Sequence, residues 1–145
     1  MESKSTELFI GKREVSFYDA PIFNTTPKAS LNLNQIYDLI KGDSYKRITE
    51  AVRGSSSKEI IKEIKSHRLD YVTFGGVFEK RANTSLQKAS GYMAIDLDDL
   101  SEVEKVKQIL LNDQMLDTVM LFTSPSGKGL KWIIHHDPRY EMEYG

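Results

Sequence analysis

The apolar residues of this chain change their spacing near Asp70, and this change limits the folds that the chain can adopt. Before Asp70, apolar side chains recur at the spacing of amphipathic helices in residues 33–40, 45–52 and 60–64. After Asp70, short runs rich in β-branched, aromatic and other apolar residues predict strands in residues 71–78, 91–98, 118–123 and 130–135. The glycine pair at residues 75–76 predicts a turn or bulge within the first of these runs. Helices and strands are therefore expected mainly in separate parts of the chain.

The order of the segments predicts an α+β fold with a mixed or largely antiparallel sheet flanked by helices. Residues 7–18 read as a strand or hairpin, residues 19–30 as a loop, and Gly42 as the end of the first helix. Two capping-box patterns, Ser56 with Glu59 and Ser101 with Glu104, predict the starts of two helices. Residues 81–90 are expected to be a polar loop, and residues 91–98 a buried central strand. We expect one domain over residues 1–145, in which the pattern of apolar residues changes at Asp70.

The composition excludes several classes of protein. Hydrophobic residues make up 39% and charged residues 28% of the 145 residues, as in an ordinary globular domain. The net charge of −1 gives no overall basic field for nucleic acid, so such a partner needs a local patch. The absence of cysteine excludes disulfides and thiolate metal sites and fits a cytoplasmic protein. No segment approaches the roughly 20 apolar residues of a membrane span, so no membrane is expected as a partner.

Two carboxylates follow the apolar start of the strand at residues 91–98. Asp96 and Asp98 are two positions apart, so in a strand both side chains point to the same face. Their α-carbons are then about 7 Å apart, which lets both carboxylates reach one Mg²⁺ or Mn²⁺ ion. The alternative is that Asp98 and Asp99 only favour the positive end of the following helix. Asp96 fits that alternative less well, because a charge at the end of a core strand is costly unless paired.

The residues between the last two predicted strands have the composition of a phosphate-holding turn. They supply hydroxyls, lysine side chains and flexible backbone amides, from Ser124, Ser126, Gly127, Lys128, Gly129 and Lys131. Amides in such turns can form anion-binding concavities, and lysine adds a point charge. The spacing is not that of a Walker A loop. The alternative is a plain hairpin turn, since serine, proline and glycine favour turns in any case.

Three further sites have weaker support. Lys80 and Arg81 follow a predicted strand and could reach a triphosphate or a template backbone, or could be a solvated edge. His135 and His136 are adjacent, so in a strand they face opposite ways and favour a solvated strand end over a metal site. The lysines at positions 58, 62 and 65 are expected to form a solvated helix face.

Three sequence runs follow one another in the second half of the chain: FGGVFEKR at residues 74–81, SGYMAIDLDDL at residues 90–100 and SPSGKGLK at residues 124–131. In this order they resemble the VirE N-terminal domain of bacterial and mobile-element proteins. That domain resembles a branch of the archaeo-eukaryotic primase, or primase-polymerase, superfamily. The resemblance covers roughly residues 70–135 and implies an RRM-like sheet flanked by an N-terminal α/β unit. The α/β unit would be residues 1–69, and residues 70–145 would be part of the catalytic-type sheet.

The resemblance implies roles for individual residues. The acidic pair of the superfamily falls on Asp96 and Asp98, as catalytic metal ligands for Mg²⁺ or Mn²⁺. Its Ser-Gly turn ends in a histidine that contacts nucleotide phosphates, and here Lys131 stands at that position. Lysine can hold phosphate but does not copy the geometry or the titration of imidazole. A third acidic residue is expected beyond Gly145. We therefore expect this chain to be the front piece of a longer protein and to be inactive in isolation.

The leading hypothesis is a metal-dependent nucleotidyltransferase domain of a DNA replication or mobilisation protein. Its expected partners are a nucleoside triphosphate, a single-stranded DNA template and a helicase domain in the same chain. One alternative is a catalytically inactive primase-like module that binds DNA or a partner protein. Another is a two-metal phosphodiesterase that uses Asp96, Asp98 and a histidine from position 135 or 136.

Overall fold

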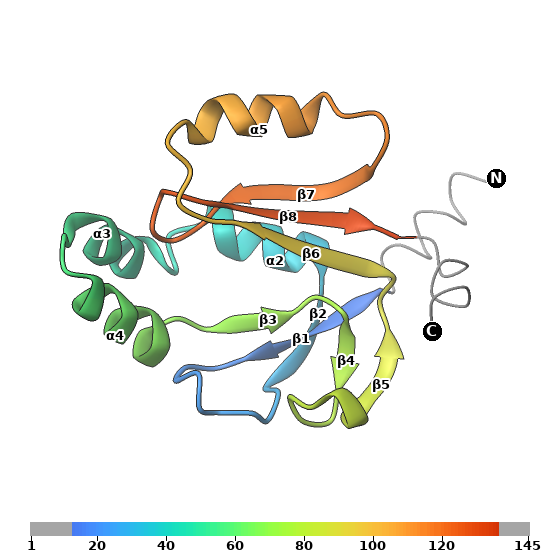
Figure 1. Ribbon diagram of the computed structural model, residues 1–145. Coiled ribbons are helices and arrows are strands. Elements are labelled where there is room, and N and C mark those ends of the chain that lie inside the picture. Colours follow the sequence, from blue (N-terminus) through green and yellow to red (C-terminus); the bar gives the residue numbers. More distant parts are fainter. Residues whose placement is uncertain (1–12, 137–145) are drawn as a thin grey trace. The chain divides into compact units, whose positions relative to one another are not determined.

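A computed structural model describes residues 13–136, and its paired strands are antiparallel. The chain forms two compact units, an N-terminal unit that ends at Ser90 and a C-terminal unit that begins at Gly91. Four α-helices lie among short strands in the described residues (Figure 1). The predicted α+β class is therefore confirmed for this part of the chain.

The N-terminal unit contains two small sheets. Strand β1 (Glu14–Tyr18) lies between β2 (Ala29–Asn32) and β3 (Tyr71–Thr73). Strands β4 (Gly76–Phe78) and β5 (Leu86–Ala89) form a separate two-stranded ribbon, joined through the 3₁₀ turn η1 (Asn83–Ser85). The two sheets are linked where the Phe78 amide donates to the buried Ser16 Oγ at 2.9 Å. Burying the Ser16 hydroxyl is therefore compensated by a hydrogen bond.

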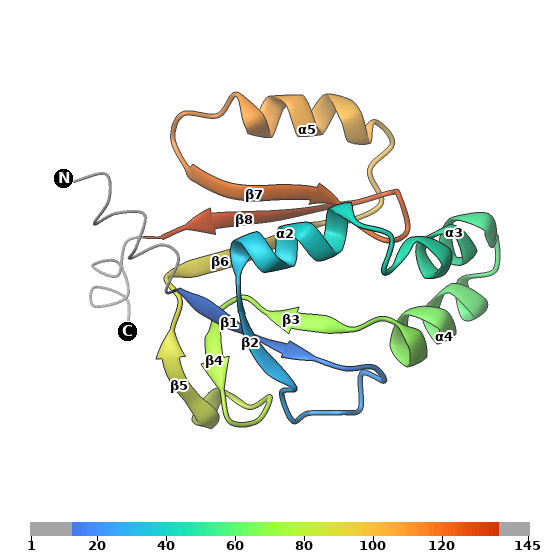
Figure 2. The ribbon, with the colours of Figure 1, turned by 180° about the vertical axis from the view of Figure 1, so that it is seen from behind.

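Three helices follow β2 in the N-terminal unit, namely α2 (Leu33–Lys41), α3 (Lys46–Gly54) and α4 (Lys58–Arg68). Helix α2 begins with a capping box between Asn32 and Gln35 and ends at Gly42, which was the predicted end. The predicted Ser56–Glu59 box at α4 is wrong. The capping residue is Ser57, whose Oγ accepts from the Ile60 amide at 3.3 Å. Helices α3 and α4 pack against each other (Figure 2).

The carboxylate of Asp70 connects three segments of the N-terminal unit. One oxygen accepts a hydrogen bond from the Tyr45 hydroxyl, and the other accepts from the Ala20 amide at 2.8 Å. Burial, reinforced by the hydrogen bond and the negative charge of Asp70, raises the pKa of the Tyr45 phenol well above its usual range. The Tyr45 phenol therefore stays protonated and keeps donating to Asp70 at neutral pH.

The C-terminal unit is a three-stranded sheet with one helix. Its elements are β6 (Tyr92–Leu97), α5 (Val103–Leu111), β7 (Asp117–Thr123) and β8 (Leu130–His135), and the strand order is β6-β8-β7. Helix α5 runs alongside β7 (Figure 1). The side chains of Leu130, Trp132, Ile133 and Ile134 are all buried, so β8 is the core strand of this sheet.

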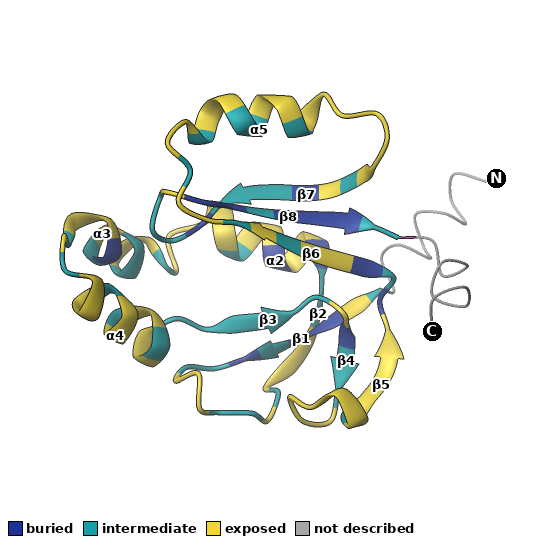
Figure 3. Ribbon diagram, viewed as in Figure 1, coloured by how far each residue is buried: buried dark blue, intermediate teal, exposed yellow. Residues whose placement is uncertain are grey.

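The predicted central strand is an edge strand. Strand β6 pairs only with β8 in the sheet of the C-terminal unit, because the later strand β8 takes the middle position. Several β6 residues are exposed, including Met93 at 46%, whereas β8 is largely buried (Figure 3). The apolar start of β6 therefore does not mean that this strand is buried on both faces.

Other expectations also differ from the structure. The predicted loop at residues 81–90 contains β5, which pairs with β4. Helix α5 begins after Glu102 with no side-chain cap, so the Ser101–Glu104 box is wrong. Along the chain, the boundary between the two compact units lies between residues 90 and 91, and β3 belongs to the N-terminal unit, where it pairs with β1. Of the predicted first strand, residues 7–12 lie outside the described residues.

None of the helices in residues 13–136 has the length and apolar character needed to cross a membrane.

Candidate functional site

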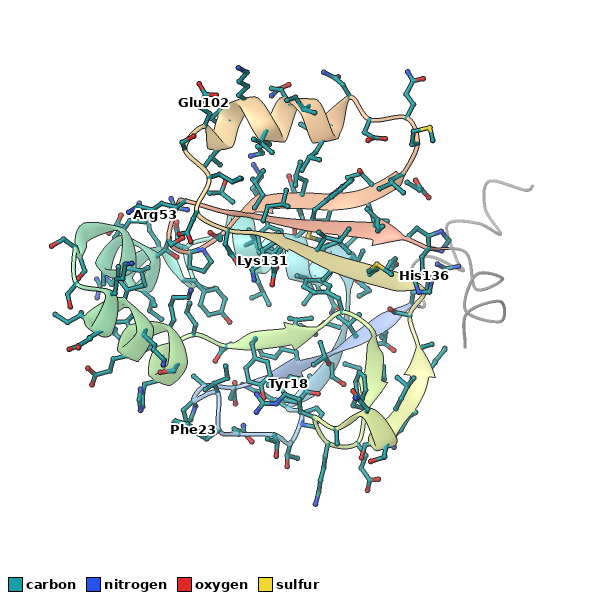
Figure 4. All side chains as sticks on the ribbon, viewed as in Figure 1. Tyr18, Phe23, Arg53, Glu102, Lys131 and His136 are labelled. Carbon is teal, nitrogen blue, oxygen red and sulfur yellow. The ribbon has the colours of Figure 1, made fainter. Side chains whose placement is uncertain are left out.

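An ion pair joins β6 to β8 at the first predicted acidic residue. Asp96 lies opposite Lys131 in the antiparallel register, and Lys131 in turn lies opposite Phe122 on β7. Opposite residues in an antiparallel pair point to the same face of the sheet. The Lys131 Nζ atom is 2.9 Å from Asp96 Oδ1, with 35% of the lysine side chain and 52% of the aspartate side chain exposed. The position of Lys131 in the structure can be seen in Figure 4. Asp96 from the predicted acidic segment and Lys131 from the predicted phosphate-holding turn are therefore in contact.

The second predicted acidic residue lies just after β6. Leu97 forms the last register pair of β6 with Leu130, so Asp98 is one residue beyond the sheet, and it is exposed. The next residue, Asp99, has a φ of 53°, a left-handed conformation that aspartate tolerates better than most residues. The chain then turns back, and the Leu100 amide donates to the Lys128 carbonyl at 2.8 Å. The segment that carries Asp98 is therefore bonded directly to the β7–β8 hairpin.

Gly129 allows the hairpin to approach the end of β6 closely. A Cβ atom at this position would lie 2.6 Å from the Leu97 carbonyl oxygen and 3.5 Å from the Asp98 Cα. It would also lie 3.1 Å from Ser124 Oγ. Because only a residue without a Cβ fits here, Gly129 sets the distance between the hairpin and the acidic segment.

The hairpin itself is held by internal hydrogen bonds. The Gly127 amide donates to the Ser124 carbonyl at 2.9 Å, which closes a β-turn with Pro125 at its second position. The Lys128 amide donates to Ser126 Oγ at 3.2 Å, and Ser126 Oγ lies 3.1 Å from Ser124 Oγ. Two amides of the predicted anion-binding concavity therefore already have acceptors. Phosphate contacts from this turn would come mainly from the Ser126 hydroxyl and the exposed Lys128 side chain.

Arg81 lies in the N-terminal unit and holds a loop there. Its Nη1 atom donates to the Ile22 carbonyl at 2.8 Å and to the Tyr71 hydroxyl at 3.0 Å. Its guanidinium also lies over the Tyr71 ring, 5.2 Å from the centroid. The Arg81 amide donates to the Thr25 carbonyl at 2.8 Å. The guanidinium predicted to bind nucleotide therefore has these partners within its own unit.

The two predicted histidines lie away from the acidic pair. His135 is four residues from Lys131 along β8, which corresponds to roughly 13 Å at the rise of a strand. Its Nδ1 atom is 3.7 Å from Asp117 Oδ2, and its ring meets the Tyr92 ring edge to face. His136 follows β8, and its amide donates to the Gly91 carbonyl at 3.0 Å. The structure therefore does not bring His135 to Asp96 within the C-terminal unit.

The acidic pair suits a hard divalent cation but supplies only part of its ligands. Mg²⁺ and Mn²⁺ prefer carboxylate oxygen and are often held by one or two carboxylates together with water and substrate phosphates. The described residues contain no group of three or more histidine, cysteine or acidic side chains positioned around one ion. Two aspartates alone would therefore need further ligands, such as water or a bound phosphate, to complete the coordination of such an ion.

The family of the chain follows from a comparison with protein-family models. Residues 64–144, more than half of the chain, match the model described as BT4734-like, N-terminal domain. The chain belongs to this family. The matched part of the BT4734-like domain begins within α4 and includes Arg81, both acidic residues and the hairpin. No curated protein and no solved structure matches the chain.

Proposed function

We propose that this BT4734-like domain binds nucleoside triphosphates with a divalent metal and serves template-directed nucleotidyl transfer, as its resemblance to primase-polymerases implies. The observation that carries the proposal is the 2.9 Å contact between Lys131 and Asp96. It joins the candidate phosphate-binding hairpin to the candidate metal ligand. Two sequence patterns that each have an ordinary structural explanation thus meet in one exposed site.

The topology of the C-terminal unit supports an RRM-like assignment. A strand, a helix and two strands follow one another, and the last strand lies between the other two. This is the order found in the first part of a βαββαβ sheet. A shared topology does not define an activity, so the function depends on the site residues.

Each residue of the site has a proposed task. Asp96 and Asp98 hold Mg²⁺ or Mn²⁺, which when bound neutralises charge on the phosphates. Lys128 and Lys131 hold the triphosphate by charge, and Ser126 donates a hydrogen bond to it. Ser124, which is buried, orients the Ser126 hydroxyl through their 3.1 Å contact. The reaction transfers a nucleotide to a hydroxyl group and releases pyrophosphate, with single-stranded DNA as template.

A second candidate function is a non-catalytic module that binds DNA or a partner protein. The observation in its favour is Lys131, which stands where the resemblance implies a histidine and which neutralises Asp96. In this reading the primase-like sheet is kept for recognition, and neither metal nor nucleotide is required.

Replacement of Asp96 with alanine tests the proposed function. The assay uses the full-length protein, because the isolated chain is expected to be inactive. We expect its primer extension on a single-stranded DNA template with Mn²⁺ to fall by at least about a hundredfold, because a metal ligand is lost. The assay measures incorporation of labelled deoxynucleotides. The control is Glu102→Ala, which removes an acid that pairs with Lys105 on α5.

Three results distinguish the candidates. Loss of incorporation in Asp96→Ala, with activity retained in Glu102→Ala, supports nucleotidyl transfer. Equal incorporation in the wild-type protein and Asp96→Ala contradicts the role of Asp96. Binding of single-stranded DNA without incorporation by the full-length wild-type protein favours the non-catalytic module.

A further inference from the structure

The candidate metal ligand and a candidate phosphate ligand neutralise each other in this structure. Lys131 Nζ is 2.9 Å from Asp96 Oδ1, and their register positions hold them opposite each other on adjacent strands. Among residues 13–136, the other lysine–acid pairs lie outside this site, between Lys28 and Asp19 and between Lys105 and Glu102. A cation that binds at Oδ1 of Asp96 would therefore have to compete with the charge of Lys131.

We propose that Lys131 is an exchangeable counter-ion, which keeps divalent metal from Asp96 until a triphosphate draws the lysine away. This inference rests on the proposed function and adds a mode of regulation at the same site. The ammonium group and a divalent cation are both attracted to the Asp96 carboxylate and therefore compete for it, and the negative charge of a triphosphate attracts the ammonium group away from it. Metal and triphosphate therefore bind in a coupled manner, each favouring the other.

The exposure of the pair makes this exchange feasible. Both side chains are partly open to solvent, so the ion pair is weakened by water and is not locked in a dry interior. Lysine also has a flexible stem and three donors that can be redirected without moving the backbone. The backbone below it is held more firmly, because β8 is the central strand and pairs on both sides. The side chain can thus move while the strand stays in place.

Coupling of this kind is reciprocal. If triphosphate raises the affinity for metal by releasing Asp96, metal must raise the affinity for triphosphate by the same factor. The effect on metal affinity and the effect on triphosphate affinity can each be measured without the other ligand. When metal affinity is measured, a variant without the lysine charge imitates the triphosphate-bound protein. When triphosphate affinity is measured, a variant without the aspartate charge imitates the metal-bound protein.

The first measurement titrates Mn²⁺ alone, without nucleotide, and detects free Mn²⁺ by electron paramagnetic resonance. We expect Lys131→Met to bind Mn²⁺ about tenfold more tightly than the wild-type protein, since a positive charge next to the cation is gone. Lys131→Arg keeps the charge and should behave as the wild type. Lys105→Met is the matched control, because it removes a lysine from an ion pair on α5 of the same unit.

The second measurement uses a non-hydrolysable deoxynucleoside triphosphate in the presence of EDTA and detects binding by calorimetry. We expect Asp96→Asn to bind this probe several-fold more tightly than the wild type, because Lys131 is released. The gain should disappear in the Asp96→Asn, Lys131→Met double variant, since the effect acts through the lysine. Glu102→Gln is the matched acid control. Circular dichroism of each variant establishes that it is folded.

The outcomes separate this inference from the proposed function. Tighter Mn²⁺ binding in Lys131→Met, with a gain in triphosphate binding that depends on Lys131, supports the exchange. Equal or weaker Mn²⁺ binding in Lys131→Met, when Asp96→Asn still abolishes metal binding, overturns the exchange and leaves the proposed function intact. No Asp96-dependent binding of Mn²⁺ with or without the triphosphate overturns both.

Discussion

Replacement of Gly76 with alanine is expected to destabilise the protein by about 3 kcal/mol or more. Gly76 begins β4 with a φ of 153°, a conformation that residues with a side chain rarely adopt. A Cβ atom would also lie 2.1 Å from the Lys88 carbonyl oxygen on the paired strand β5. Because the obstructing atom belongs to the backbone, the strain can only be relieved by separating the two strands. Urea denaturation followed by circular dichroism measures the effect.

The adjacent glycine provides the control for this substitution. A Cβ atom at Gly75 would meet no atom within 4 Å. Gly75→Ala should therefore change the free energy of unfolding by less than about 1 kcal/mol. Similar unfolding midpoints for the two variants would contradict the close approach of β4 and β5 at Gly76.

Replacement of Gly129 with alanine is expected to cost about 2–4 kcal/mol of stability and also to weaken triphosphate binding. The new Cβ atom would lie 2.6 Å from the Leu97 carbonyl oxygen. Relief of this contact moves the hairpin away from the end of β6, which separates Lys128 from the acidic segment. The Leu100–Lys128 backbone hydrogen bond, at 2.8 Å, should weaken at the same time. Denaturation and calorimetry with a non-hydrolysable triphosphate measure the two effects.

Gly54 offers a comparison for the Gly129 variant. It ends α3, and a Cβ atom there would meet nothing within 4 Å. Gly54→Ala should leave stability and triphosphate binding close to those of the wild type. If Gly129→Ala bound the triphosphate as tightly as Gly54→Ala, the position of the hairpin would not matter for binding.

The sequence was sufficient to predict the elements that have a clear period or a clear boundary. Helix α2 has apolar residues at helical spacing and ends before Gly42. The glycine pair at residues 75–76 marks the turn after β3, with Gly75 in the turn and Gly76 as the first residue of β4. Strands β7 and β8 flank a turn with strong turn-forming residues. In each case the decisive information lies within a few neighbouring residues.

The missed features depend on contacts between distant segments. Strand β5 is exposed along its length, and Gln87 and Lys88 interrupt any apolar pattern, so only its pairing with β4 defines it. The edge position of β6 depends on β8, which comes more than 30 residues later in the chain. An apolar run can indicate a strand, but it does not determine which strand takes the middle of the sheet.

The candidate site was predicted in its composition but not in its geometry. Asp96 and the hairpin residues were each identified from local sequence. Their contact through Lys131 requires the register between β6 and β8, and no short-range pattern specifies that register. Asp96 lies on an edge strand, is half exposed and pairs with Lys131, so the sequence argument that its charge would be unpaired in a core strand does not hold.

The most direct test of the account is an amide nuclear magnetic resonance titration with Mg²⁺ and a non-hydrolysable triphosphate. If the acidic segment and the hairpin form one site, the largest shifts should occur together in residues 96–100 and residues 126–131, and Asp96→Asn should remove the Mg²⁺-dependent part of both. Shifts confined to one of these segments, or shifts that Asp96→Asn leaves unchanged, would contradict a shared metal and phosphate site.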